Sequence, residues 1–207
     1  MGDPNVKAEL TSFDKVSVAL YRSGIVVASL CLIFGLYYFY TLTIKGHPSF
    51  LLQDGVPEIV FWAFFVSVGI SLSFLHLYSS QILRVVQGFF MISALILIPL
   101  TFMSENSFLK SLFIGTGEYN KLGTVGIGFL LAGYSSIGAK EAYCFKLYEG
   151  YLYAILSFFL VIIHLIGPSP KVELGLFTVI TVLAVVFTIR KLRLPLHYDI
   201  GDKSHYQ

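Results

Sequence analysis

Six long apolar runs constrain the fold of this chain more than any other feature of its sequence. A transmembrane α-helix needs about 20 mostly apolar residues to cross about 30 Å of hydrocarbon. The sequence therefore predicts an all-α, polytopic membrane bundle of six transmembrane helices. The runs that meet the requirement cover residues 18–44, 59–79, 83–103, 122–143, 150–167 and 172–192.

The composition agrees with a membrane protein and argues against other classes. Hydrophobic residues make up 56% of the 207 residues and charged residues only 13%, whereas soluble domains carry about 25% charged residues. The net charge of +2 gives no reason to expect nucleic-acid binding, so the expected partner is the lipid bilayer. The two cysteines indicate neither a disulfide framework nor a zinc module.

Three segments follow from these runs: an N-terminal tail over residues 1–15, a transmembrane domain over 16–193 and a C-terminal tail over 194–207. The first apolar run is far longer than the 7–15 residue core of a signal peptide, which favours a retained first helix. The longest connection, 104–121, holds an apolar patch, Phe108 to Ile114, that is too short to span and is expected on the membrane interface.

The distribution of lysine and arginine predicts the orientation. Ten of these residues fall on the side of the two termini and four on the opposite side, so the positive-inside rule places both termini in the cytoplasm. The ten are Lys7, Lys15, Arg22, Arg84, Lys140, Lys146, Arg190, Lys191, Arg193 and Lys203. The four are Lys45, Lys110, Lys121 and Lys171.

The fourth run carries small residues four positions apart, at Thr124, Gly128, Ala132 and Ser136. Small side chains on one stripe let a neighbouring helix approach closely in lipid. We therefore expect this helix to be central and tightly surrounded.

Ionisable residues near the predicted cytoplasmic ends are the candidates for function. Arg22 has two equally weighted interpretations: its side chain reaches the headgroups, or it forms an ion pair with Glu141. Cys144 follows Lys140 and Glu141 by one helical turn and can share their face. An inert, packed cysteine is the commoner outcome, and a catalytic thiol is the minority interpretation.

Two histidines raise a haem or metal hypothesis. His76 lies near the predicted cytoplasmic end of the second run and His164 near the outer end of the fifth. Their depths differ by roughly 20 Å at 1.5 Å per residue, so one shared site is not expected. Hydrogen bonding inside the bundle is favoured for each over separate ligand sites.

Further polar residues belong to the same cytoplasmic side. Arg84 and Gln87 open the third run, and Asp199 and Asp202 flank a glycine in the C-terminal tail. A structured tail that caps this face is the preferred interpretation, and a metal or phosphate site is the alternative. No ligand spacing specifies a metal.

Several short motifs resemble a family of uncharacterised integral membrane proteins, known from photosynthetic and other bacteria and catalogued as a domain of unknown function. They are YRSG (21–24), LHLY (75–78), QGF (87–89), GIGF (126–129), KEAYCF (140–145) and DIGDKS (199–204). The family usually has phenylalanine where this chain has Tyr143. The resemblance implies a bacterial inner or thylakoid membrane protein without an established reaction, cofactor or partner. It also implies that Arg22, His76, Gln87, Lys140, Glu141, Cys144, Asp199 and Asp202 are the residues to probe.

Three functional hypotheses remain open at this point. The first is a structural or accessory component that presents a polar cytoplasmic face to a larger complex or to a second copy. The second is an enzyme or a haem or metal binder with a cytoplasmic pocket, and the third is a small-solute transporter. The absence of a recognisable catalytic motif favours the first.

Overall fold

The computed structural model describes residues 10–46, 55–77, 79–103, 118–167 and 169–200, with the side chains of 118–120 excepted. Within these residues the secondary structure is helical, with no strand. The helices are α1 (Ser12–Tyr40), the π-helical turn η1 (Thr41–Lys45), α2 (Val56–Ser73), α3 (Ser80–Met103), α5 (Glu118–Phe145), α6 (Glu149–Ile166), α7 (Pro170–Leu192) and α8 (His197–Ile200).

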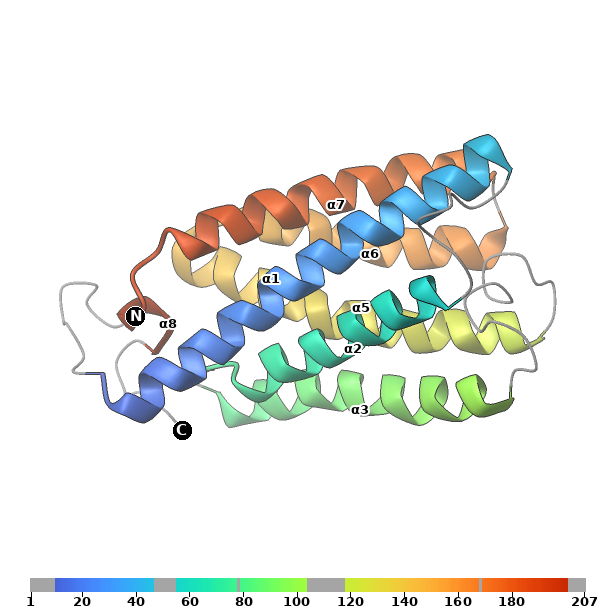
Figure 1. Cartoon of the computed structure of the whole chain (residues 1–207). Coiled ribbons are helices and arrows are strands. Elements are labelled where there is room, and N and C mark those ends of the chain that lie inside the picture. The colour runs from blue at the N-terminus through green and yellow to red at the C-terminus, as the bar shows by residue number, and fades with distance from the viewer. Residues whose placement is uncertain (1–9, 47–54, 78, 104–117, 168, 201–207) are drawn as a thin grey trace.

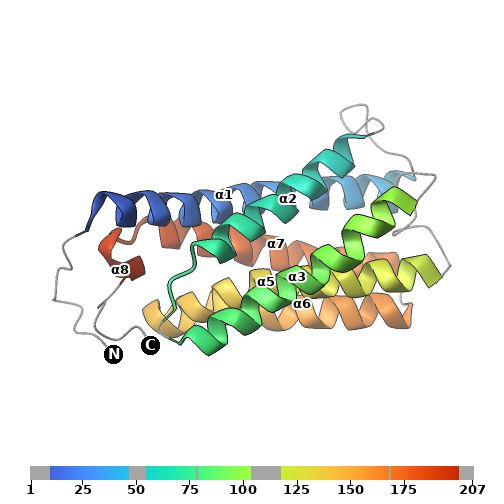
Figure 2. The same ribbon diagram turned by 90° about the horizontal axis from the view of Figure 1, so that it is seen from below.

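Among the described residues, six helices are long and apolar enough to cross a membrane, as the predicted fold class and number of spans require. The start of α1 and the short helix α8 lie at the same end of the molecule (Figures 1 and 2). We call this the α8 end. It is the end that the positive-inside rule predicts to be cytoplasmic. The patch Phe108 to Ile114 lies outside the described residues.

The first helix begins earlier than hydropathy predicts because of a capping box. The Asp14 backbone N–H donates to Thr11 Oγ1 at 3.2 Å, and the Thr11 backbone N–H donates to Asp14 Oδ2 at 2.9 Å. These two bonds satisfy backbone groups that a helix start leaves unpaired. Residues 12–17 therefore belong to α1.

The second helix ends earlier than predicted, at Ser73 rather than near residue 79. Gln87 Nε2 of α3 donates to the Leu72 carbonyl oxygen at 3.3 Å and so satisfies one of the last carbonyls of α2. The following Leu75 is buried although it lies in the connection. The prediction of a helix through His76 was wrong. Hydropathy assigns the apolar residues after Ser73 to the helix, whereas they form a connection that packs against the core.

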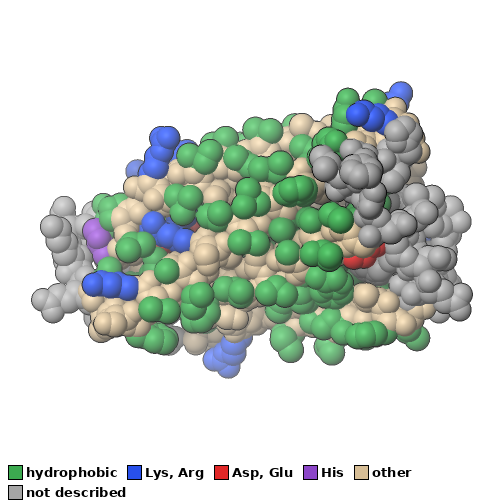
Figure 3. Space-filling view, in the orientation of Figure 1, with side chains coloured by type: hydrophobic (Ala, Val, Ile, Leu, Met, Phe, Trp, Pro, Cys, Tyr) green, Lys and Arg blue, Asp and Glu red, His purple; other side chains and the backbone are tan. Residues whose placement is uncertain are grey.

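The bundle is arranged around two groups of packed helices. Helix α1 packs on α2 and α7, whereas α5 packs between α3 and α6. Contacts of α6 with α7 and of α2 with α5 join the groups (Figures 1 and 2). Hydrophobic side chains cover the middle of the face in Figure 3, as a lipid-facing surface requires.

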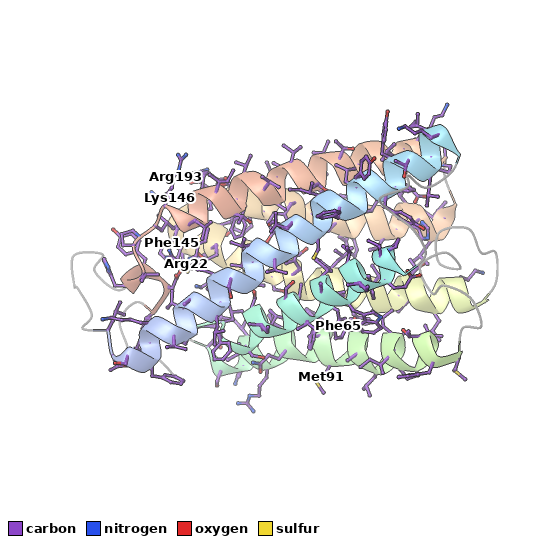
Figure 4. All side chains as sticks on the ribbon, in the orientation of Figure 1. Arg22, Phe65, Met91, Phe145, Lys146 and Arg193 are labelled. Carbon is purple, nitrogen blue, oxygen red and sulfur yellow. The ribbon has the colours of Figure 1, made fainter. Side chains whose placement is uncertain are left out.

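A line of aromatic rings crosses the core. Tyr134 of α5 contacts Phe64 of α2 and Tyr153 of α6, with ring centroids 5.6 and 5.4 Å apart. Tyr153 in turn meets Phe187 of α7 at 5.6 Å. Phe65 of α2, which is labelled in Figure 4, packs on Phe90 of α3 with the ring centroids 4.7 Å apart. Because aromatic pairs have preferred geometries, these contacts help to fix how the helices pack against one another.

Helix α5 is the most buried span, with half of its most apolar window inside the molecule. The tightest contacts lie at glycines outside the row from Thr124 to Ser136. A Cβ atom on Gly150 of α6 would lie 2.3 Å from the carbonyl oxygen of Gly138 on α5. The central position of α5 is therefore as expected, but the row of small residues is not where its neighbours approach most closely.

We predict that Gly150→Ala destabilises the protein, because the added methyl group meets backbone that cannot move aside. The expected loss is about 1–3 kcal/mol of unfolding free energy, measured by thermal or denaturant unfolding in detergent micelles. Gly175→Ala is the matched control, because a Cβ atom there has nothing within 4 Å. Equal stability of the two variants would contradict the tight α5–α6 contact.

Candidate functional site

Charged residues complete the buried faces of two helices at the α8 end. On each helix, three uncharged residues on one face are buried. A charged residue, four positions after the last of them, lies on the same face and is buried too. On α5 the series is Leu130, Tyr134, Ile137 and Glu141, all 1% exposed or less. On α7 it is Ile180, Ala184, Phe187 and Lys191, all 2% exposed or less. This spacing follows one face of an α-helix.

Lys191 lies at the centre of the resulting ion network. Its Nζ atom donates to Glu141 Oε2 of α5 and to Asp199 Oδ1 of α8. The side chains of all three residues are at most 1% exposed. A buried charge is tolerated only when it is paired and hydrogen-bonded, so these contacts fix the relative positions of α5, α7 and α8.

Arg22 extends the network to α1. Its Nε atom donates to Asp199 Oδ2 at 2.6 Å, and its Nη1 and Nη2 atoms donate to the carbonyl oxygens of Leu194 and Pro195 at 2.7 and 3.0 Å. With 7% of its surface exposed, Arg22 does not reach outward to headgroups. The ion-pair interpretation was right in kind, but the partner is Asp199 rather than Glu141. Figure 4 shows Arg22 at the α8 end.

Lys140 and Tyr21 complete the set. Lys140 Nζ and the Tyr21 hydroxyl both donate to Glu141 Oε1, at 2.7 Å each. We define the ion network as Tyr21, Arg22, Lys140, Glu141, Lys191 and Asp199. Its three cations and two carboxylates leave one excess positive charge.

Aromatic rings accommodate this excess charge. Lys191 Nζ lies 4.6 Å from the centre of the Phe145 ring and 5.6 Å from that of Tyr21. Lys140 Nζ lies 5.5 Å from the Tyr21 ring and 5.7 Å from Phe145. The negative face of an aromatic ring attracts a cation at such distances, so the network can hold one more cation than carboxylates.

The other predicted site residues lie outside this network. Arg84 is exposed and donates to the Ser80 carbonyl oxygen of its own helix at 3.4 Å. Gln87 caps α2, as described above, and Cys144 is half-buried one turn beyond Lys140. Asp202 lies outside the described residues. The structure thus brings together Arg22, Lys140, Glu141 and Asp199 from the predicted set.

His76 lies in the connection after α2, near enough to Lys140 and Asp199 for their charges to act on it. Burial lowers the pKa of His76, the Lys140 charge lowers it further, and the carboxylates of Asp199 and Asp14 oppose the shift. The imidazole is therefore neutral at pH 7 in the folded protein.

His164 lies at the opposite end of the bundle, where its Nδ1 atom is 2.8 Å from Glu173 Oε2. This pair borders an apolar pocket of about 180 Å³ between α1, α2, α5, α6 and α7. The two histidines therefore do not share a site. Among the described residues, no group of three or more His, Cys, Asp or Glu side chains is placed to hold a metal ion.

The chemistry of the ion network is structural. Each carboxylate oxygen of Glu141 and Asp199 accepts a hydrogen bond from a cation or a hydroxyl within the network. Neither carboxylate keeps an oxygen without such a donor, and both are buried. The network therefore holds α8 against the bundle.

Sequence reasoning missed Lys191 and Tyr21 as members of this site. Lys191 lies between Arg190 and Arg193 near the end of α7, so the sequence gives it the same interpretation as these two interfacial cations. Its position four residues after the buried Phe187 distinguishes it, because that spacing places it on the core face.

Removal of the Asp199 charge tests the network. We expect Asp199→Asn to lower the unfolding free energy by about 3–5 kcal/mol, because it leaves Arg22 and Lys191 buried with fewer counter-charges. Thermal unfolding in micelles measures the loss. Arg193→Gln, at an exposed position nearby, should change stability by no more than about 0.5 kcal/mol. A neutral outcome for Asp199→Asn would contradict the network.

His76 predicts a pH dependence of stability. Its pKa is lower in the folded state, so the unfolded state binds the proton more readily. Stability is therefore full above the unfolded-state pKa of about 6.5 and falls as the pH drops below it. Unfolding midpoints measured between pH 8 and 5 should fall less steeply for His76→Gln than for the wild type. Parallel profiles would exclude this contribution.

Comparison with known proteins places the chain among integral membrane proteins without an assigned activity. No solved structure matches it. An uncharacterized protein of Haemophilus influenzae is 26% identical over 212 residues, which cover 100% of this chain and 99% of the relative. The profile of the family described as "Uncharacterized integral membrane protein (DUF2301)" matches residues 70–207. The chain belongs to this family of uncharacterized integral membrane proteins.

Proposed function

We propose that the protein is a structural or accessory component of a bacterial inner or thylakoid membrane. In this proposal its α8 end faces the cytoplasm and binds an acidic surface of a partner protein. The proposal is supported by the way in which charge is divided between the inside and the surface at this end.

At this end every described acidic residue is buried, whereas the basic residues are divided between the buried ion network and the surface. The described acidic residues at the α8 end are buried, and they are Asp14, Glu141, Glu149 and Asp199. The exposed charged residues described there are basic, and they are Lys15, Arg84, Lys146, Arg190 and Arg193. Figure 4 shows Lys146 and Arg193 together beside this end. The surface that remains is positive, and a positive surface attracts a negative partner.

The positive-inside rule accounts for basic residues at a cytoplasmic end but not for the burial of every described acid there. A surface that only orients the protein can carry acids as well, because Asp and Glu contribute little to orientation. Burial of the carboxylates leaves the rim with one sign of charge. This single observation carries the proposal.

A second function is favoured by the apolar pocket at the opposite end. Most of its lining is apolar, with His164 and Glu173 at one side. Such a pocket suits an apolar small molecule with one hydrogen-bonding end. The ligand hypothesis therefore moves from the α8 end, where the ion network fills the space, to the other side of the bundle. The Leu131→Trp variant, which fills this pocket, would abolish a thermal stabilisation by such a ligand.

The partner proposal is tested by charge reversal. The double variant Lys146→Glu/Arg193→Glu should dissociate the native complex, because it places acids opposite the partner's acids. Blue-native electrophoresis of membranes from the source bacterium measures the size of the complex. Lys45→Glu, at an exposed position on the opposite end, is the matched control and should leave the complex unchanged. An unaltered complex in the double variant would contradict the proposal.

A further inference from the structure

A groove runs along the outer side of α5, between α3 and α6, with a volume of about 470 Å³. We call it the α5 groove. Five small residues of α5 line it, together with the larger Val125, Phe129 and Leu131 of the same helix, and they are Gly128, Ala132, Ser135, Ser136 and Ala139. Phe89 of α3 and Phe158 of α6 stand at its sides. Gly128, Ala132 and Ser136 of the small-residue row thus line a surface groove, although Gly128 also lies close to Val161 of α6.

The helices beside the groove are the least covered in the bundle. The most apolar windows of α3 and α6 are each 22% buried, whereas that of α5 is 50% buried. Phe158 is 65% exposed and Ile155 is 54% exposed on α6. The side of the bundle formed by α3 and α6 is therefore somewhat more exposed than the sides formed by α1, α2 and α7, whose windows are 33–39% buried.

Two hydroxyl groups in the groove lack a hydrogen-bond partner. Ser135 and Ser157 are 8% and 2% exposed, and their Oγ atoms make no hydrogen bond within the described structure. Both residues line the groove. Ser93 of α3 also has such a hydroxyl but lies elsewhere.

Most hydroxyls in these helices behave differently. Ser136 donates to the Ala132 carbonyl oxygen at 2.8 Å, and Thr181 donates to that of Phe177 at 2.8 Å. Bonding to the carbonyl one turn earlier is the usual solution for serine and threonine in a helix. Ser135 and Ser157 depart from it, so two buried hydroxyl groups of residues that line the groove have no partner within the chain.

The depth of these hydroxyls restricts the occupant. Ser157 is eight residues from the start of α6 and Ser135 is ten residues from the end of α5, so both lie about 12–15 Å from the α8 end along their helices. Water is absent at that level of a bilayer. A lipid acyl chain fills a groove but offers no acceptor, whereas a helix offers hydroxyl and carbonyl oxygens.

We propose that the α5 groove is the contact surface of a parallel two-fold dimer, in which α6 of each copy lies in the groove of the other. Membrane insertion gives both copies the same orientation, so the two-fold axis lies along the membrane normal. Every residue then meets its counterpart at equal depth. The Ser157 residues of the two copies therefore lie at the same depth in the membrane. Because a hydroxyl can both donate and accept, the two could form a hydrogen bond with each other.

The shapes of the two surfaces also match. The exposed Phe158 is a large knob, and Ala132 and Ser136 form a small-residue hole at a neighbouring level. Helices in lipid associate where small residues allow close packing and where polar side chains form hydrogen bonds across the contact. The dimer goes beyond the proposed function, because it uses the lipid-facing side and not the basic surface of the α8 end.

Photocrosslinking in membranes tests this dimer with the full chain. We expect a benzophenone amino acid in place of Phe158 to give a crosslinked dimer, with the crosslinked peptide within residues 121–140 of the second copy. The same probe at Val179, an exposed position on α7, is the matched control and should give no dimer. Crosslinks from Phe158 only to lipid, or to a different protein, would overturn the proposal.

A second experiment separates loss of the dimer from loss of the fold. Ala132→Phe fills the groove and should reduce the dimer fraction at least tenfold in bilayers of fixed lipid-to-protein ratio, with the unfolding midpoint retained. Ser135→Ala/Ser157→Ala should reduce the dimer fraction several-fold. Lys146→Glu/Arg193→Glu should leave it unchanged, so failure of the cytoplasmic-partner proposal is distinguished from failure of the dimer. A dimer that persists in Ala132→Phe would contradict the proposal.

Discussion

The structure depends on the buried ammonium group of Lys191, held between Glu141 and Asp199. A buried cation without counter-charges is strongly unfavourable, and removal of one partner from a buried pair leaves an uncompensated charge. The requirement to pair Lys191 brings α5, α7 and α8 together, and Asp199 then recruits Arg22 of α1. Segments 177 residues apart in the sequence are therefore joined at one end of the bundle.

Within the same network, the conspicuous polar residues are bonded to one another. Their hydrogen-bonding groups are directed at one another, and two aromatic rings take up the excess charge. The carboxylates of Glu141 and Asp199 are removed from the surface, and the exposed charged residues described around them are basic. The burial of these two carboxylates thus contributes both to the packing of this end and to the charge of its described surface.

The sequence was sufficient for the six spans because each apolar run is close to the thickness of a bilayer. It was insufficient where tertiary contacts decide. Arg22 had two plausible environments, and only the position of α8 selects Asp199 as its partner. His76 was assigned to a helix because its neighbours are apolar. In the structure α2 ends at Ser73, where Gln87 of α3 bonds to the Leu72 carbonyl oxygen.

Lys191 and the small-residue row show the same limit at the candidate sites. Lys191 could have been recognised from its spacing to Phe187, but nothing local indicates which carboxylates surround it. The row on α5 lies on a central helix, as predicted, but it faces a groove more than it faces the helices of its own chain. It could not indicate whether the packed neighbour belongs to the same chain, because a helix presents the same pattern to either partner.

The most direct test of the central claim is a double-mutant cycle between Lys191 and Glu141, using Lys191→Met, Glu141→Gln and the double variant. Unfolding free energies measured in one detergent give the coupling energy of the two side chains. The account predicts a coupling of about 1–3 kcal/mol, as found for residues in one buried network. Effects that add to within about 0.5 kcal/mol would show that the two residues are independent and would contradict it.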